Sequence, residues 1–135
     1  MKLFCSNAFT GEDFSTVSNR MQLVVDSLNK SGHEAYCPIF DPHKIALQER
    51  QATKEIFDYA FQNLTICDGM VAIITSDRKS EGQLMEIGAI LADNKPLYLF
   101  VHNSASEAPS HLQKLAAKVF TWSSDEDLAN KLADI

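Results

Sequence analysis

Hydrophobic residues follow two alternating patterns along the chain. Short apolar runs predict strands at residues 2–6, 34–37, 70–75, 97–101 and 119–122. Between them, apolar residues three and four positions apart predict helices over residues 14–30, 51–64, 82–93 and 110–118, and a closing helix that begins at Asp125. Because strands and helices alternate, the pattern indicates a parallel sheet with both faces covered.

We therefore predict an α/β fold, a flavodoxin-like doubly wound sandwich with a five-stranded parallel sheet. The 135 residues are compatible with a single domain, residues 1–135, that buries about two-thirds of its unfolded surface without disulfide or metal support. Segment 39–49 contains Pro42 and shows no clear period. We predict a loop there and regard it as a candidate active-site loop.

Composition narrows the choice of partners. The chain has 12 Lys and Arg against 18 Asp and Glu, a net charge of -6, and no basic block. This balance disfavours polynucleotide binding and leaves a small anionic ligand open. Because no apolar run approaches the ~20 residues of a membrane span, we expect no membrane partner, and the first residues become polar too soon for a signal peptide.

The positions of cysteine and histidine argue against disulfide bonds and against a metal-binding site. Cys5, Cys37 and Cys67 form no Cys-x-x-Cys pair and lie in or beside apolar runs, as expected for reduced, mostly buried thiols of a cytoplasmic protein. The four histidines show no ligand spacing. We accordingly expect no metal and no cofactor.

A candidate functional site follows the third predicted strand, in the stretch from Ser80 to Gly88. Its carboxylate, Glu86, stands in the first turn or two of a helix just beyond a buried strand, at the sheet edge where open parallel sheets bind ligands. A purely structural interpretation is also open. In it, the helix dipole favours Glu86, while Ser80 is an N-cap and Gly88 a packing glycine.

The same residues resemble a known family. Asp68-Gly-Met-Val-Ala, then Ser80-x-Gly82-x-x-x-Glu86-Ile87-Gly88, then Asn94-Lys95-Pro96 before a strand are similar to the nucleoside 2-deoxyribosyltransferases and the related 2'-deoxynucleoside 5'-monophosphate N-glycosidases. The resemblance covers most of the chain, from the first strand to the region of Trp122. Only the middle segment is specific.

The resemblance implies an enzyme that cleaves or transfers at an N-glycosidic bond of a small nucleoside or nucleotide. Glu86 corresponds to the nucleophile that attacks C1′ of the 2'-deoxyribose and leaves a glycosyl-enzyme, a role that suits a carboxylate near an oxocarbenium-like transition state. The expected substrate-binding residues are Ser80, Gly82, Asn7, Asp68 and Gly88. Family members complete the pocket with a neighbouring subunit, which implies a homodimer or larger homo-oligomer.

Two positions depart from the family pattern. Phe4 replaces a tyrosine whose hydroxyl orients the glutamate, so a hydrogen bond to Glu86 must come from elsewhere. Ala60 replaces an acid that handles the proton of the leaving base, and Glu55 or Asp58 would have to act from a neighbouring turn. Losing a general acid removes about 10²- to 10⁴-fold of rate. A catalytically weak or inactive nucleotide-binding or sensing module is therefore the alternative.

Other segments of the chain give weaker indications of ligand binding or of a subunit interface. Asn7, Thr10 and Gly11 lie in the turn after the first strand, where a doubly wound fold binds phosphate, and the Thr-Gly pair faintly resembles a flavodoxin phosphate loop. The remaining Thr and Ser residues of that loop are absent, so a plain loop is favoured over FMN binding. The Asp41–His43 segment is either a cover over a nucleobase or an ordinary turn, and the turn is favoured. Phe57 and Phe61 fit helical core packing better than a subunit interface.

Overall fold

The computed structural model describes residues 1–8, 11–78, 80–105 and 110–135, so Thr10 and part of the Ser- and Ala-rich loop lie outside the described residues. Within them, five parallel strands form one sheet in the order β2-β1-β3-β4-β5. The strands are β1 (Lys2–Asn7), β2 (Glu34–Tyr36), β3 (Gly69–Ile74), β4 (Leu97–His102) and β5 (Lys118–Trp122). The helices are α1 (Phe14–Lys30), α2 (Pro42–Glu49), α3 (Thr53–Ile66), α4 (Glu81–Ala92), α5 (Ser110–Leu115) and α6 (Asp125–Leu132).

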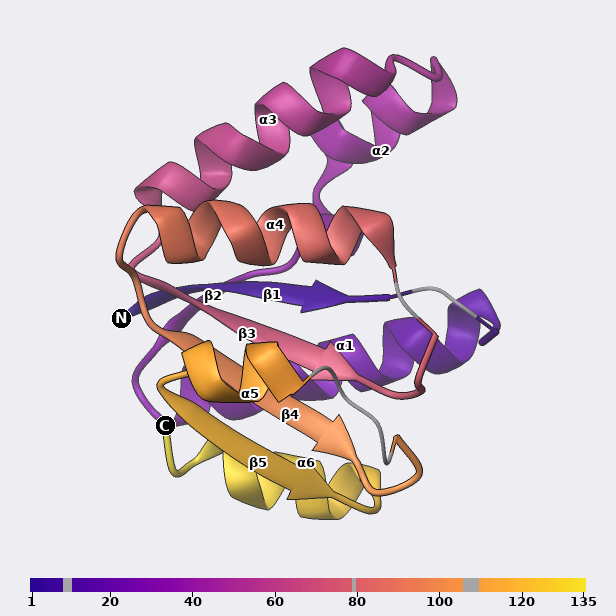
Figure 1. Ribbon diagram of the computed structural model, residues 1–135. Coiled ribbons are helices and arrows are strands. Elements are labelled where there is room, and N and C mark those ends of the chain that lie inside the picture. Colours follow the sequence, from indigo (N-terminus) through magenta and orange to yellow (C-terminus); the bar gives the residue numbers. More distant parts are fainter. Residues whose placement is uncertain (9–10, 79, 106–109) are drawn as a thin grey trace.

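Helices cover both faces of the sheet, which confirms the predicted α/β class (Figure 1). Strand β1 shows how the alternation of side chains divides the core. Leu3 and Cys5 pack in one cluster with α1 and α6, while Phe4 packs in the other with α3 and α4. Because successive strand residues point to opposite faces, Ser6 lies on the same face as Phe4.

Helix α1 has the predicted bounds because its local signals are strong. Its buried stripe includes Val17, Met21 and Val24 at helical spacing. The Asp13 side chain caps the first turn by accepting a hydrogen bond from the Thr16 backbone N–H at 2.8 Å. The 14–30 prediction is confirmed at both ends.

The predicted loop at 39–49 is wrong. This segment contains a 3₁₀ turn, Pro38–Phe40, followed by helix α2. Asp41 caps α2 through a 3.0 Å hydrogen bond from the His43 N–H, and Pro42 occupies the first turn, where its missing N–H has no cost. Only Leu47 of α2 is buried, so the helix shows too little apolar periodicity to be found from sequence.

Other boundaries shift by a few residues. Gln51 adopts a left-handed φ of 53°, and α3 starts after it, at Thr53 rather than at residue 51. Helix α5 ends at Leu115 because β5 already begins at Lys118. The three cysteines are free and buried. None of the described helices is long and apolar enough to cross a membrane.

Candidate active site at the carboxyl end of strand β1

Helix α4 carries Glu86 to the edge of the sheet. The Ser80 hydroxyl caps the helix by accepting from the Gln83 N–H at 3.3 Å. The buried Gln83 side chain donates to the Ile73 carbonyl at 3.2 Å and ties the helix to the end of β3. Since Gln83 and Ile87 are buried one turn apart, Glu86 lies on the flank of the buried face, beside β1.

Ser6, near the end of β1, holds the Glu86 carboxylate. Its hydroxyl donates to Glu86 Oε1 at 2.9 Å, and the Ser6 residue is only 2% exposed. Burial raises the pKa of Glu86 above its usual value, while the Ser6 hydrogen bond and the nearby Lys44 charge oppose that rise. The hydroxyl that Phe4 lacks is thus supplied two residues further along the same strand face.

A small cavity of about 40 Å³ adjoins the carboxylate and holds no more than a few water molecules. Its lining comes from β1, from the segment after β2, from α2 and from α4: Cys5, Ser6, Asn7, Cys37, Pro38, Ile39, Lys44 and Glu86. The Asn7 side chain donates to the Ala8 carbonyl at 2.5 Å, but its buried Oδ1 has no hydrogen-bond partner among the described residues. An unpaired acceptor next to a carboxylate is a natural contact for a ligand hydroxyl or amine.

The expected contacts Ser80, Gly82 and Gly88 share the helix of Glu86 but not its cavity. Ser80 lines a separate space of about 30 Å³ with Arg78. A Cβ atom added at Gly82 or Gly88 would meet no atom within 4 Å, so packing within the chain does not require glycine at either position. Gly82 lies in the first turn of α4, where backbone N–H groups are able to bind an anion.

Asp68 lies far from Glu86 in the sheet. Its carboxylate accepts a hydrogen bond from the Lys2 N–H at 2.7 Å, at the amino ends of β1 and β3. Glu86 lies at the carboxyl end of β1. The structure therefore brings Ser6, Asn7 and Lys44 to the glutamate, and does not bring Asp68 there.

Among the described residues, Glu86 is the one acid that lines this cavity, so no second acid there takes the place of the one expected at position 60. Ala60 is buried, and the two neighbouring acids of α3 are engaged elsewhere. Glu55 pairs with Arg50 at 2.9 Å and Asp58 with Lys54 at 2.7 Å. Both carboxylates line a space between α2 and α3 rather than the cavity beside Glu86.

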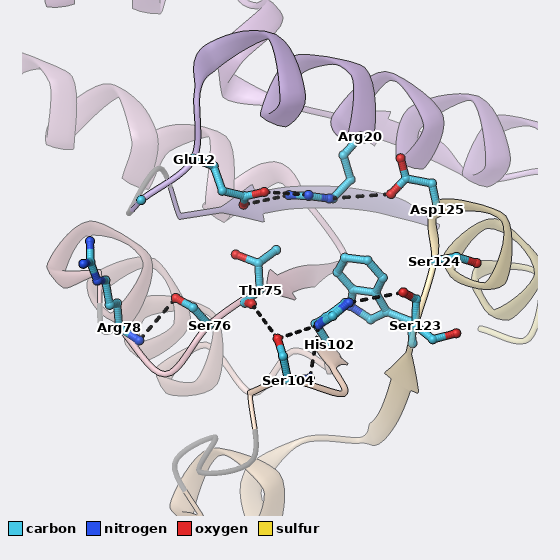
Figure 2. A pocket seen from close by; sticks show the side chains of 12 residues that line it. Glu12, Arg20, Thr75, Ser76, Arg78, His102, Ser104, Ser123, Ser124 and Asp125 are labelled. Carbon is cyan, nitrogen blue, oxygen red and sulfur yellow. Dashed lines mark hydrogen bonds and ion pairs between the residues drawn. The ribbon is translucent and has the colours of Figure 1, made fainter.

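A larger cavity of about 450 Å³ lies at the carboxyl ends of β3, β4 and β5 (Figure 2). Arg20 donates to both Glu12 oxygens, at 2.9 and 2.7 Å, and its Nε lies 3.8 Å from Asp125. His102 stands between Ser104 and the Ser123 carbonyl. The walls are thus largely paired with one another, and the cavity does not include Glu86.

The periodicity of the chain does not predict this cluster of charges. Its one local signal is the position of Arg20, three residues after Val17 and four before Val24, within the buried stripe of α1. A charged residue at such a position requires a partner. Within the described residues no group of three or more His, Cys, Asp or Glu side chains is placed to hold a metal ion.

Comparisons with known proteins agree with this architecture. The sequence model of one family, described as nucleoside 2-deoxyribosyltransferase, matches residues 4–127. No curated protein matches the chain.

Solved structures share the fold at low identity. A CMP N-glycosidase, BcmB, from Clostridium botulinum has a TM-score of 0.68 and 17% identity, over 98% of this chain and 97% of that one. A 2-deoxyribosyltransferase from Bacillus psychrosaccharolyticus has a TM-score of 0.66 and 19% identity, over 96% and 91%. A conserved protein from Enterococcus faecalis V583 has a TM-score of 0.59 and 17% identity, over 98% and 97%.

Proposed function

Because the chain belongs to the nucleoside 2-deoxyribosyltransferase family, we propose that it cleaves or transfers at the N-glycosidic bond of 2'-deoxynucleosides or their 5'-monophosphates, with Glu86 as the nucleophile. The observation that carries the proposal is the Glu86 carboxylate, held by Ser6 beside a cavity at the carboxyl end of β1. Of the two enzymes that share the fold, one is named as an N-glycosidase of CMP and the other as a 2-deoxyribosyltransferase, which supports the proposal.

In the proposed reaction, the Glu86 carboxylate attacks C1′ of the sugar and also stabilises the positive charge that develops there. Among the described residues Ser6 is the one hydrogen-bond donor to its carboxylate, through Oε1, so Oε2 is free to attack C1′. The C1′–N bond breaks, its electron pair leaves with the base, and the carboxylate stabilises the positive charge that develops on the sugar. Water or an acceptor base then attacks C1′ and releases Glu86.

Binding contacts follow from the same geometry. The N–H groups at the start of α4, near Gly82, and the Ser80 hydroxyl suit a sugar oxygen or a phosphate. Asn7 Oδ1, which accepts no hydrogen bond from the part of the chain that the structure describes, suits a donor on the substrate. We assign no contact to Asp68, given its place at the opposite edge of the sheet, and Gly88 contributes only open space. Completion of the pocket by a second subunit is part of the proposal.

The test is chromatography of free base released from a panel of deoxynucleosides, ribonucleosides and their 5'-monophosphates, each with and without an acceptor base. Glu86→Ala should abolish release while retaining the fold. Glu81→Ala is the matched control, because Glu81 is an exposed acid in the first turn of the same helix. Equal activity of the Glu86 variant and the parent would refute the assignment.

A nucleotide-binding module without turnover is the second candidate. It is favoured by one observation, that neither Glu55 nor Asp58 lines the Glu86 cavity in place of the acid missing at Ala60. Isothermal titration with 5'-deoxynucleotides separates the two. Saturable binding with no base released from any member of the panel supports the module, whereas release by the parent alone supports the enzyme.

A further inference from the structure

Helix α2 is held in a fixed position near the candidate nucleophile. Asp41 caps it through the His43 N–H, and its other oxygen, Oδ2, accepts from the Tyr36 and Tyr59 hydroxyls at 2.7 and 2.6 Å. One carboxylate thereby joins β2, α2 and α3. Although desolvation acts to raise the pKa of Asp41, hydrogen bonds from Tyr59, Tyr36 and the backbone hold it below its usual value. An ionised cap of this kind orders the first turn of α2.

That first turn places Lys44 in the wall of the cavity that also contains Glu86. Lys44 is half-buried and belongs to none of the ion pairs between described residues. Lys44 therefore lines the site without a carboxylate partner among the described residues. A cation in the wall of a small cavity interacts with a carboxylate there more strongly than it would in open solvent.

The other titratable groups of this cavity carry no charge near neutral pH. Burial raises the pKa of the Cys5 thiol well above its usual value and that of Cys37 to about 12. The Ser6 hydroxyl on β1 is neutral. Glu55 and Asp58 on α3 lie outside the cavity and form ion pairs with Arg50 and Lys54. Of the residues that the structure describes, Lys44 is thus the one charged side chain that shares the cavity lining with Glu86.

We propose that Lys44 is a positioning residue that keeps the Glu86 carboxylate ionised and ready to attack C1′. The inference rests on the proposed role of Glu86 as nucleophile. Only the anion of Glu86 can attack the sugar, and burial of its carboxyl disfavours that anion. The Ser6 hydroxyl provides one stabilising contact, and the Lys44 charge provides the second. Lys44 forms no bond to the substrate in this scheme and acts through Glu86 alone.

The test compares the pH dependence of kcat/KM for base release in the parent, Lys44→Met, Lys44→Arg and Lys30→Met. Lys30 ends α1 on the opposite face of the sheet and is exposed, so its variant is a control for loss of one surface charge. Lys44→Met should lose roughly tenfold at the acid end of the profile and progressively less toward alkaline pH. Lys44→Arg should restore the parent profile. An equal loss at every pH would overturn the proposal.

A second readout does not depend on turnover. The carboxyl ¹³C signal of Glu86, assigned by its absence in Glu86→Gln, is titrated in the parent and in Lys44→Met. The midpoint should move to higher pH when the Lys44 charge is removed. If the parent releases no base but the midpoint moves, the proposed reaction fails and the Lys44–Glu86 coupling stands; an unmoved midpoint overturns the coupling whatever the activity.

Discussion

Ser6 Oγ donates to Glu86 Oε1 at 2.9 Å, joining the end of β1 to the second turn of α4 across 80 positions of sequence. Both residues lie at the carboxyl edge of the sheet, and the serine is almost fully buried. A hydrogen bond to a buried carboxylate favours the charged form and fixes the direction of its free oxygen.

Replacing Ser6 with Ala removes the hydroxyl donor. Because the hydrogen bond lowers the pKa of Glu86, its loss should move the acid limb of kcat/KM to higher pH. Hydrogen bonds to charged groups contribute about 1.5–3 kcal/mol, so we expect the rate of base release at acidic pH to fall by roughly tenfold or more. Ser31→Ala, at an exposed position after α1, should leave the profile unchanged, and a parent-like Ser6→Ala would contradict the prediction.

Replacing Glu86 with Gln should stabilise the fold at neutral pH. Burial raises the folded-state pKa of Glu86 above its unfolded value, so the parent is most stable when this group is protonated and loses stability as pH rises through the folded pKa. Because glutamine stays neutral at every pH, the Gln variant does not lose stability in this way. Thermal unfolding should show a higher Tm for Glu86→Gln by a few degrees at neutral pH, converging with the parent in acid. A constant difference in Tm at all pH values would argue against a raised folded-state pKa of Glu86.

Restoring the family hydroxyl at Phe4 should not accelerate the reaction. The Phe4 ring is fully buried and lies 5.4 Å from the Tyr36 ring, centroid to centroid. A hydroxyl added there enters the apolar cluster of Phe4, where an unpaired hydroxyl costs about 1–3 kcal/mol. Phe4→Tyr should therefore unfold at lower urea concentration with no gain in kcat. A clear gain in kcat would show that Ser6 does not fill the role of the missing tyrosine.

Replacing Asp41 with Ala should loosen α2. The change removes an N-cap and the acceptor of two tyrosine hydroxyls, and we expect a loss of about 1–3 kcal/mol in unfolding free energy at neutral pH. Because the folded pKa of Asp41 is depressed, its contribution is present above the unfolded pKa and fades as pH falls through the folded value.

Urea unfolding at neutral and acidic pH measures this difference. Asp41→Asn keeps a capping side chain and should be milder than Asp41→Ala. Asp26→Ala, on the exposed side of α1, is the control. An Asp41→Ala protein as stable as the parent at neutral pH would show that the tyrosine network contributes little.

Local periodicity predicted the strands and most helices well. The stripe of α1 and the all-buried run of β3 depend on residues a few positions apart, so their patterns are visible in one dimension. The same holds for the capped start of α4 and hence for the position of Glu86 near a helix start. Helix α2 was not predicted, because only one of its residues is buried and it therefore shows no apolar periodicity.

The sequence by itself therefore determined the α/β alternation and the place of the candidate carboxylate, since both follow from local spacing. Only the tertiary structure decided its surroundings. Ser6, Lys44 and Glu86 come from three elements, and they meet because β2, β1 and β3 are neighbours in the sheet and α2 is held by the tyrosine contacts of Asp41. Strand order and crossover geometry are long-range outcomes of packing, and no local pattern encodes which side chains they bring together.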